Sequence, residues 1–147
     1  DFEDAFFHVM TTIIEPEIGH DGPVVVDRWP KQLCALAALC DDDPLYAQRF
    51  ELYAGGLELA NAFFELRDAD EQLRRFANAN RRRRERGLED LPIPHSYLAD
   101  LDRMPPTSGI AMGVDRLMMW MWQVSRIDDV YPLRWDDESE PTAAGCG

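Results

Sequence analysis

Residues 50–68 read FELYAGGLELANAFFELRD, and this stretch decides the fold. Two runs of strand-forming residues, 50–54 and 57–66, flank the pair Gly55 and Gly56. Two glycines between such runs are typical of a β-hairpin, because a tight turn needs positive φ angles. We therefore expect an antiparallel hairpin here.

The rest of the chain alternates predicted helices with predicted strands. Apolar residues at helical spacing predict helices over residues 2–15, 31–39, 69–86, 96–102 and 115–123. β-branched or small apolar runs predict a buried strand over residues 24–26 and further strands over residues 108–113 and 130–133. Strands and helices in this order predict an α+β fold in which helices pack on an antiparallel sheet.

Size and charge set the outer limits. The 147 residues suffice for one domain, expected over residues 1–135, and the acidic, then small and polar residues 136–147 are expected to form a flexible tail. A net charge of −13 argues against general nucleic-acid binding, and no apolar run is long enough to span a membrane. The odd number of cysteines, three, fits neither a disulfide framework nor a zinc site and points to reduced thiols in the cytoplasm.

The second run of the hairpin carries three polar residues among apolar neighbours: Glu58, Asn61 and Glu65. Their offsets of three and seven also fit one helix face, whereas on a strand Glu58 joins the other two only if a bulge intervenes. Buried carboxylates and amides need partners, and an acidic pocket suits an ammonium ligand, a metal ion or both. A solvated strand face with a few charges is the alternative interpretation.

A second polar constellation lies in SGIAMGVDRL, residues 108–117. Its glycines allow close backbone approach where a strand passes into a helix. The N-terminus of that helix favours an anion, and Arg116 adds a positive fork, so a nucleotide phosphate would fit. The alternative is that Asp115 caps a core helix and Arg116 pairs with a nearby carboxylate.

Together the two segments resemble the lysine-type branch of the class II aminoacyl-tRNA synthetases. Gly109 to Arg116 is similar to the third signature motif of that class, and residues 58–68 are similar to the strand that binds lysine and metal. The resemblance extends from about Glu15 to about Pro132. It implies that the chain forms part of a class II catalytic domain, without the first two signature motifs.

The resemblance implies a role for each matching residue. Glu58 would hold the Mg²⁺ that bridges the phosphates of ATP, and Gly113 would lie beneath the nucleotide. Asn61 would bind the carboxylate of the amino acid, and Glu65 would pair with its ε-ammonium. Arg116 would be the catalytic residue that contacts ATP.

Ala111 distinguishes two branches of the family. Lysyl-tRNA synthetases carry glycine at the matching position, whereas the lysine ligases that modify elongation factor P carry alanine. One methyl group against a close-fitting ligand is enough to favour a differently shaped isomer such as β-lysine. The resemblance therefore favours an ATP-dependent ligase that transfers lysine or β-lysine to a lysine of elongation factor P.

Two alternatives remain open. One is a lysyl-tRNA synthetase that acts on lysine tRNA, and the other is an inactive half-domain that serves as a binding module. The family implies a cytoplasmic homodimer for the parent enzyme. Because the chain shows no match to the first two signature motifs, we expect it to be inactive as an adenylating enzyme by itself.

Overall fold

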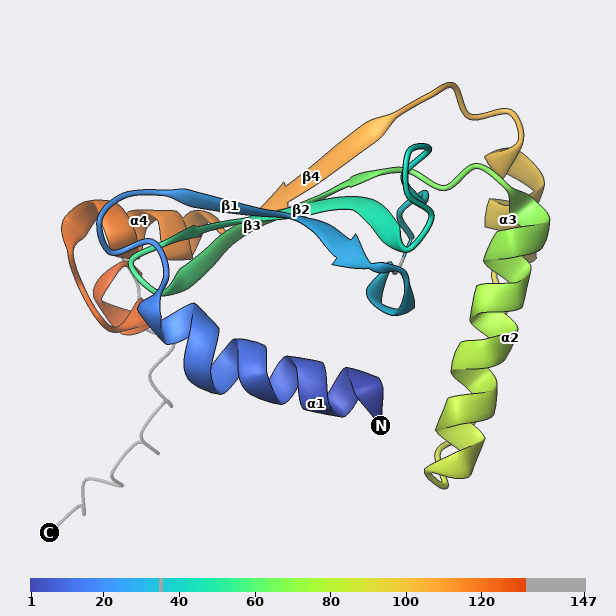
Figure 1. Cartoon of the computed structure of the whole chain (residues 1–147), viewed down its shortest axis with the longest axis horizontal. Coiled ribbons are helices and arrows are strands. Elements are labelled where there is room, and N and C mark those ends of the chain that lie inside the picture. Colours follow the sequence, from blue (N-terminus) through green and yellow to red (C-terminus); the bar gives the residue numbers. More distant parts are fainter. Residues whose placement is uncertain (35, 132–147) are drawn as a thin grey trace, which may run out of the picture.

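The computed structural model describes residues 1–34 and 36–131, and it is built around one sheet. Four antiparallel strands follow one another in chain order across this sheet, which confirms the expected α+β class (Figure 1). The strands are β1 (Val24–Pro30), β2 (Tyr46–Ala54), β3 (Leu57–Phe64) and β4 (Ser108–Met112). Strands β1 and β4 are the outer ones.

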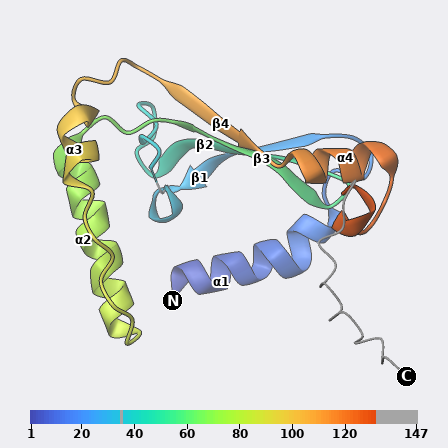
Figure 2. The ribbon, with the colours of Figure 1, turned by 180° about the vertical axis from the view of Figure 1, so that it is seen from behind.

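The helices lie at the two ends of the sheet and along one side of it. Figures 1 and 2 show α4 at one end, α2 and α3 at the other, and α1 beside the strands. The helices are α1 (Phe2–Val9), α2 (Ala69–Glu85), α3 (His95–Leu101) and α4 (Val114–Trp122). A π-helical turn (Met10–Ile14) and a 3-10 turn (Glu15–Glu17) continue α1, so the predicted helix over residues 2–15 is confirmed in its extent.

The glycine hairpin forms as expected between β2 and β3. Gly55 has a φ of 59° and Gly56 a φ of 75°, the two positive values that a type I′ turn requires. The register then shifts by one residue, because Leu52 pairs with Ala60 while Tyr53 pairs with Glu58. Such a shift places one extra residue on β3, which is a β-bulge.

Two small clusters of buried side chains fix the sheet to its neighbours. The first joins Met10 and Trp29 to Leu33 and Tyr53, and the ring of Phe6 meets Trp29 edge-on at 5.5 Å. This cluster anchors α1 and the turn after it to the side of the sheet on which Tyr53 lies. The second cluster consists of Cys34, Ala37 and Ala47.

Helix α2 is fixed at both ends. At its start, the Asp68 carboxylate accepts a hydrogen bond of 2.8 Å from the backbone N–H of Glu71, which confirms Asp68 as an N-cap. Near its end, Arg82 pairs with Glu3, and Arg86 lies 3.3 Å from Asp4. These pairs link α2 to the first turn of α1.

Four expectations about the fold were wrong or fall outside the described residues. In the described part of residues 31–39 the one helical element is a 3-10 turn (Lys31–Leu33), because Ala37 and Leu39 pair with the sheet as isolated bridges. Val25 is 57% exposed rather than buried, since β1 is an outer strand. Residues 130 and 131 are not in a strand; the remainder of that predicted strand and the predicted tail (136–147) lie outside the described residues.

Candidate functional site

The pairing of the strands gathers the predicted site residues into a row. Glu51 on β2 pairs with Asn61 on β3, and Asn61 pairs with Ala111 on β4. Directly opposed residues of antiparallel strands point to the same face of a sheet. Glu51, Asn61 and Ala111 therefore share one face, which we call the site face.

The bulge in β3 turns Glu58 onto the site face as well. Glu58 pairs with Tyr53, which stands two residues from Glu51 on β2 and so points the same way. Without the shift in register, alternation would send Glu58 to the other face from Asn61. The sequence predicted that Glu58 and Asn61 share a face of the sheet only if a bulge intervenes, and the structure contains this bulge.

Arg116 reaches the same end of β3 from the first turn of α4. Its guanidinium donates a hydrogen bond of 2.9 Å to the backbone oxygen of Glu58 and lies 3.5 Å from the Glu58 carboxylate. The two side chains are 51% and 34% exposed, so they remain open to a ligand. Arg116 thus pairs with a carboxylate, as the alternative interpretation held, and this carboxylate belongs to the predicted site.

Gly113 holds the junction between β4 and α4. Its N–H donates a hydrogen bond of 2.9 Å to the backbone oxygen of Leu59, and it is the N-cap residue of α4. A Cβ at Gly113 would lie 3.5 Å from the Arg116 side chain, so the glycine and the arginine are neighbours. The alternative in which Asp115 caps this helix is wrong, because α4 has no side-chain cap.

Glu65 lies at the opposite end of the row. Its backbone N–H donates to the oxygen of Thr107 at 2.9 Å, and it stands two residues beyond Phe63, which pairs with Gly109. A Cβ built on Gly109 would come within 2.8 Å of Oε1 of Glu65. The carboxylate therefore rests against the backbone of β4, on the site face.

Glu51 is a residue of the site face that the sequence did not reveal. It is 4% exposed, and its carboxylate accepts hydrogen bonds from Arg49 at 2.5 Å, from the amide of Asn61 at 2.9 Å and from the hydroxyl of Tyr53. Burial raises the pKa of the Glu51 carboxyl above its ordinary value, the hydroxyl of Tyr53 and the guanidinium of Arg49 oppose this, and the nearby charge of Glu58 adds to it. The sequence feature that could have identified Glu51 is its position in the predicted hairpin, directly opposite Asn61.

Arg49 anchors this network to the core. Its guanidinium lies 4.4 Å from the centre of the Trp29 ring and 5.6 Å from that of Phe63, and it donates to the backbone oxygen of Leu33 at 2.6 Å. Stacking on two aromatic rings is favourable for a desolvated guanidinium. Arg49 therefore holds Glu51, and through Glu51 the amide of Asn61, in one orientation.

The amide of Asn61 has one atom left without a partner. Its nitrogen donates to Glu51, while its oxygen Oδ1 is buried and has no hydrogen-bond partner. A flipped amide would set this oxygen against the Glu51 carboxylate, so the network fixes the orientation. Buried polar atoms are rarely left unpaired, and an unpaired acceptor in the middle of the row fits a site that receives a ligand donor.

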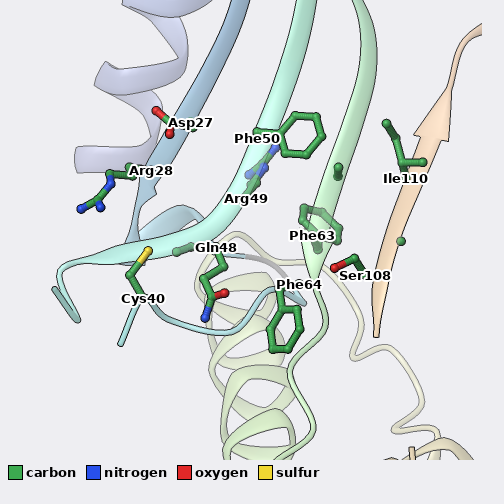
Figure 3. A pocket seen from close by; sticks show the side chains of 13 residues that line it. Asp27, Arg28, Cys40, Gln48, Arg49, Phe50, Phe63, Phe64, Ser108 and Ile110 are labelled. Carbon is green, nitrogen blue, oxygen red and sulfur yellow. The ribbon is translucent and has the colours of Figure 1, made fainter. Parts of the chain in front are cut away.

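Among the described residues, a hollow opens on the other face of the sheet. A cavity of about 530 Å³ is lined by Phe50, Ala62 and Ile110, which form the row beside that of Glu51, Asn61 and Ala111 (Figure 3). Adjacent residues along a strand point to opposite faces. None of the predicted site residues lines this cavity.

The site face also limits what kind of metal binding is possible. Within residues 1–34 and 36–131, no group of three or more His, Cys, Asp or Glu side chains could hold a metal ion alone. Glu58 and Glu51 nevertheless place two carboxylates within electrostatic reach of each other. This arrangement fits a cation that shares its ligands with a bound phosphate.

Over residues 1–34 and 36–131, no helix has the length and apolar character to cross a membrane.

Comparison with known proteins finds one family model and several named relatives that match most of the chain. The pattern of the family described as tRNA synthetases class II (D, K and N) matches residues 10–134. A protein of Pectobacterium atrosepticum named elongation factor P--(R)-beta-lysine ligase is 43% identical over 132 residues, which cover 88% of this chain and 41% of the relative. Proteins of the same name from Yersinia pestis and Yersinia pseudotuberculosis are 43% identical over 129 residues, or 86% of this chain and 40% of each relative. The chain thus spans about two fifths of the length of these relatives.

Proposed function

Because the chain belongs to the family of class II tRNA synthetases (D, K and N), we propose that the protein containing it activates a lysine-type amino acid with ATP and transfers it to a lysine of elongation factor P. The names of its relatives support this acceptor and point to (R)-β-lysine as the amino acid. Ala111 supports the same branch, since its methyl group stands beside Asn61 in the row of the site face. The cytoplasm remains the expected location.

One observation carries the proposal: Glu58, Asn61 and Glu65 share a face of the sheet, and Arg116 borders it at the end near Glu58. In this arrangement Glu65 binds the side-chain ammonium of the substrate, at the end of the row away from Arg116. Asn61 binds the head of the amino acid, through its second amide hydrogen to a carboxylate or through Oδ1 to an ammonium. Carboxylates and amides in such pairs give charge-assisted hydrogen bonds.

The other end of the row suits the nucleotide. Arg116 and the backbone at Gly113 would meet the phosphates, where a guanidinium fork and a helix N-terminus both favour negative charge. Glu58, with Glu51 behind it, would hold a Mg²⁺ together with the phosphates. That ion would neutralise charge on the departing pyrophosphate.

The proposed reaction has two steps. An oxygen of the substrate carboxylate forms a bond to the α-phosphorus of ATP as the bond to pyrophosphate breaks, which leaves an aminoacyl-adenylate. The amine of the acceptor lysine then attacks the carbonyl carbon, and AMP leaves as the nitrogen releases a proton to solvent and the amide forms. The chain's own residues contribute mainly by orienting the two substrates and by balancing their charge.

Amino-acid-dependent exchange of pyrophosphate into ATP tests the proposal in the complete gene product. We expect exchange with (R)-β-lysine and weaker exchange with L-lysine. Ala111→Gly should reduce the preference for β-lysine by about 10-fold, because one methyl group in a close-fitting pocket changes discrimination by about 1–3 kcal/mol. Ser108→Ala, on the same strand but on the other face, is the matched control and should leave the preference unchanged.

Transfer assays separate this function from its two rivals. Product on elongation factor P supports the ligase, whereas product on lysine tRNA would assign the protein to the tRNA-charging branch. Exchange with neither amino acid, from a folded protein, would leave the binding module as the remaining function.

A further inference from the structure

We infer that Gly109 is a positioning residue for substrate selection, because its lack of a side chain sets where the Glu65 carboxylate can lie. The inference rests on the proposed function, in which Glu65 binds the side-chain ammonium of a lysine-type amino acid. It adds a residue of β4 that touches no substrate and acts only through Glu65.

The backbone around Glu65 leaves the carboxylate little choice. Hydrogen bonds tie this segment to both sides: Glu65 donates to Thr107 at 2.9 Å, Leu66 donates to Leu36 at 2.9 Å, and Ala37 and Glu65 form an isolated bridge. The Cα of Glu65 is therefore held between β4 and the segment before β2. Only the side-chain torsions remain to set the position of the carboxylate.

The carboxylate occupies the space that a side chain at position 109 would need. A Cβ there would lie 2.8 Å from Oε1 and 4.0 Å from Cδ of Glu65, and apart from the two chain neighbours no other described residue comes within 4 Å. Ordinary van der Waals contact begins at 3.4 Å, so the oxygen would have to move from 2.8 to 3.4 Å, by about 0.6 Å. The far end of a flexible side chain can make this move without disturbing the strand.

The backbone itself does not require glycine at this position. The glycines with positive φ in the described chain are Gly19, Gly22, Gly55, Gly56 and Gly87, and Gly109 is not among them. A methyl group at position 109 therefore costs little in backbone strain, and its effect falls on Glu65. This separates a positioning role from a purely structural one.

The charge-assisted hydrogen bond between ammonium and carboxylate is short and directional, so a shift of this size weakens it. Partial loss of a hydrogen bond between charged groups should weaken binding of the amino acid about 10-fold. Because Glu65 lies at the end of the row away from Arg116, the loss should appear in the KM for the amino acid. The KM for ATP should not change.

The test compares Gly109→Ala with wild type in the complete gene product, using pyrophosphate exchange with (R)-β-lysine and L-lysine. We expect the KM for the preferred amino acid to rise about 10-fold, with kcat, the KM for ATP and the melting temperature close to those of wild type. Ser108→Ala is the control on the same strand. Glu65→Asp supplies a second background, because its shorter side chain withdraws the carboxylate from position 109.

In the Glu65→Asp background, Gly109→Ala should change the KM by less than about 2-fold, which gives a coupling between the two positions. Gly109→Ala could instead raise the KM equally in the wild-type and Glu65→Asp backgrounds, or leave the KM of the otherwise wild-type protein unchanged. Either result would overturn the role of Gly109 while leaving the proposed function intact. A wild-type protein that responds to neither amino acid would overturn the proposed function instead. The two failures are therefore distinguishable.

Discussion

Replacing Arg49 by methionine should expose how strongly the core supports the site. The side chains of Arg49 and Glu51 are 10% and 6% exposed, so the pair is shielded from solvent. Methionine keeps most of the apolar stem that packs near Trp29 but removes the charge. Glu51 would then be a buried carboxylate that retains the hydroxyl of Tyr53 and the amide of Asn61 as donors, without a cation.

The expected cost is about 3 kcal/mol in the free energy of unfolding. Breaking one side of a buried ion pair costs about 3–5 kcal/mol, and the two remaining donors place this site at the lower end. The double variant with Glu51→Gln should recover most of the loss, because it leaves no unpaired charge. Arg74→Met is the exposed control: the Arg74 side chain pairs with Glu71 but is 67% exposed, so its loss should cost less than about 1 kcal/mol.

The effect should depend on pH in a defined direction. Burial already raises the pKa of Glu51, and loss of the neighbouring guanidinium raises it further. A carboxyl whose pKa is higher in the folded than in the unfolded state stabilises the fold below its unfolded pKa, and this stabilisation is lost as pH rises through the folded pKa. The destabilisation by Arg49→Met should thus be largest near pH 7 and shrink as the pH falls toward the range in which Glu51 becomes protonated.

Urea unfolding, followed by circular dichroism between pH 4.5 and 7.5, measures this difference for the two variants and the wild type. A loss that is the same at every pH would refute the role of Arg49 as the counter-ion of Glu51. So would a double variant that is less stable than Arg49→Met alone.

Three further results are expected. Gly19→Ala should destabilise the chain by about 2 kcal/mol more than Gly87→Ala. Both glycines have positive φ, but only a Cβ at Gly19 would press on the backbone of Ala54, at 2.8 Å. Equal losses of the two variants in urea unfolding would contradict this contact. Asp68→Ala should cost about 1 kcal/mol in the same assay through loss of the α2 cap, and no loss would mean that the cap is replaced. Arg116→Ala should raise the KM for ATP about 10–100-fold in exchange assays, as loss of a charged hydrogen bond predicts, and an unchanged KM would remove Arg116 from the nucleotide site.

The fold was largely predictable from local signals. The glycine pair at residues 55 and 56 determined the hairpin, and Asp68 marked the start of α2 at its correct residue. Residues 31–39 were mispredicted because helical spacing of apolar residues was outweighed by pairing of Ala37 and Leu39 with distant strands. That pairing depends on tertiary context, which a local pattern does not contain.

The candidate site residues could be named from the sequence, whereas the side chains that support them could not. Glu58, Asn61 and Glu65 were identified from their chemistry, yet only the bulge in β3 shows how Glu58 comes to share a face with the other two. Glu51 was missed because its importance lies in its partners across the sheet, Arg49 and Asn61. A single sequence gives the residues on one strand, whereas a network between strands requires the register.

Calorimetric titration of the complete gene product with (R)-β-lysine and L-lysine in the presence of ATP, for wild type and Glu65→Gln, tests most directly whether the site face binds an amine. Glu65→Gln should weaken binding about 100- to 1,000-fold, since it removes one side of a desolvated ion pair. Glu89→Gln, an exposed acid beyond the end of α2, should bind as wild type does. Equal affinity of wild type and Glu65→Gln for both amino acids would contradict the assignment of this face as the amine-binding site.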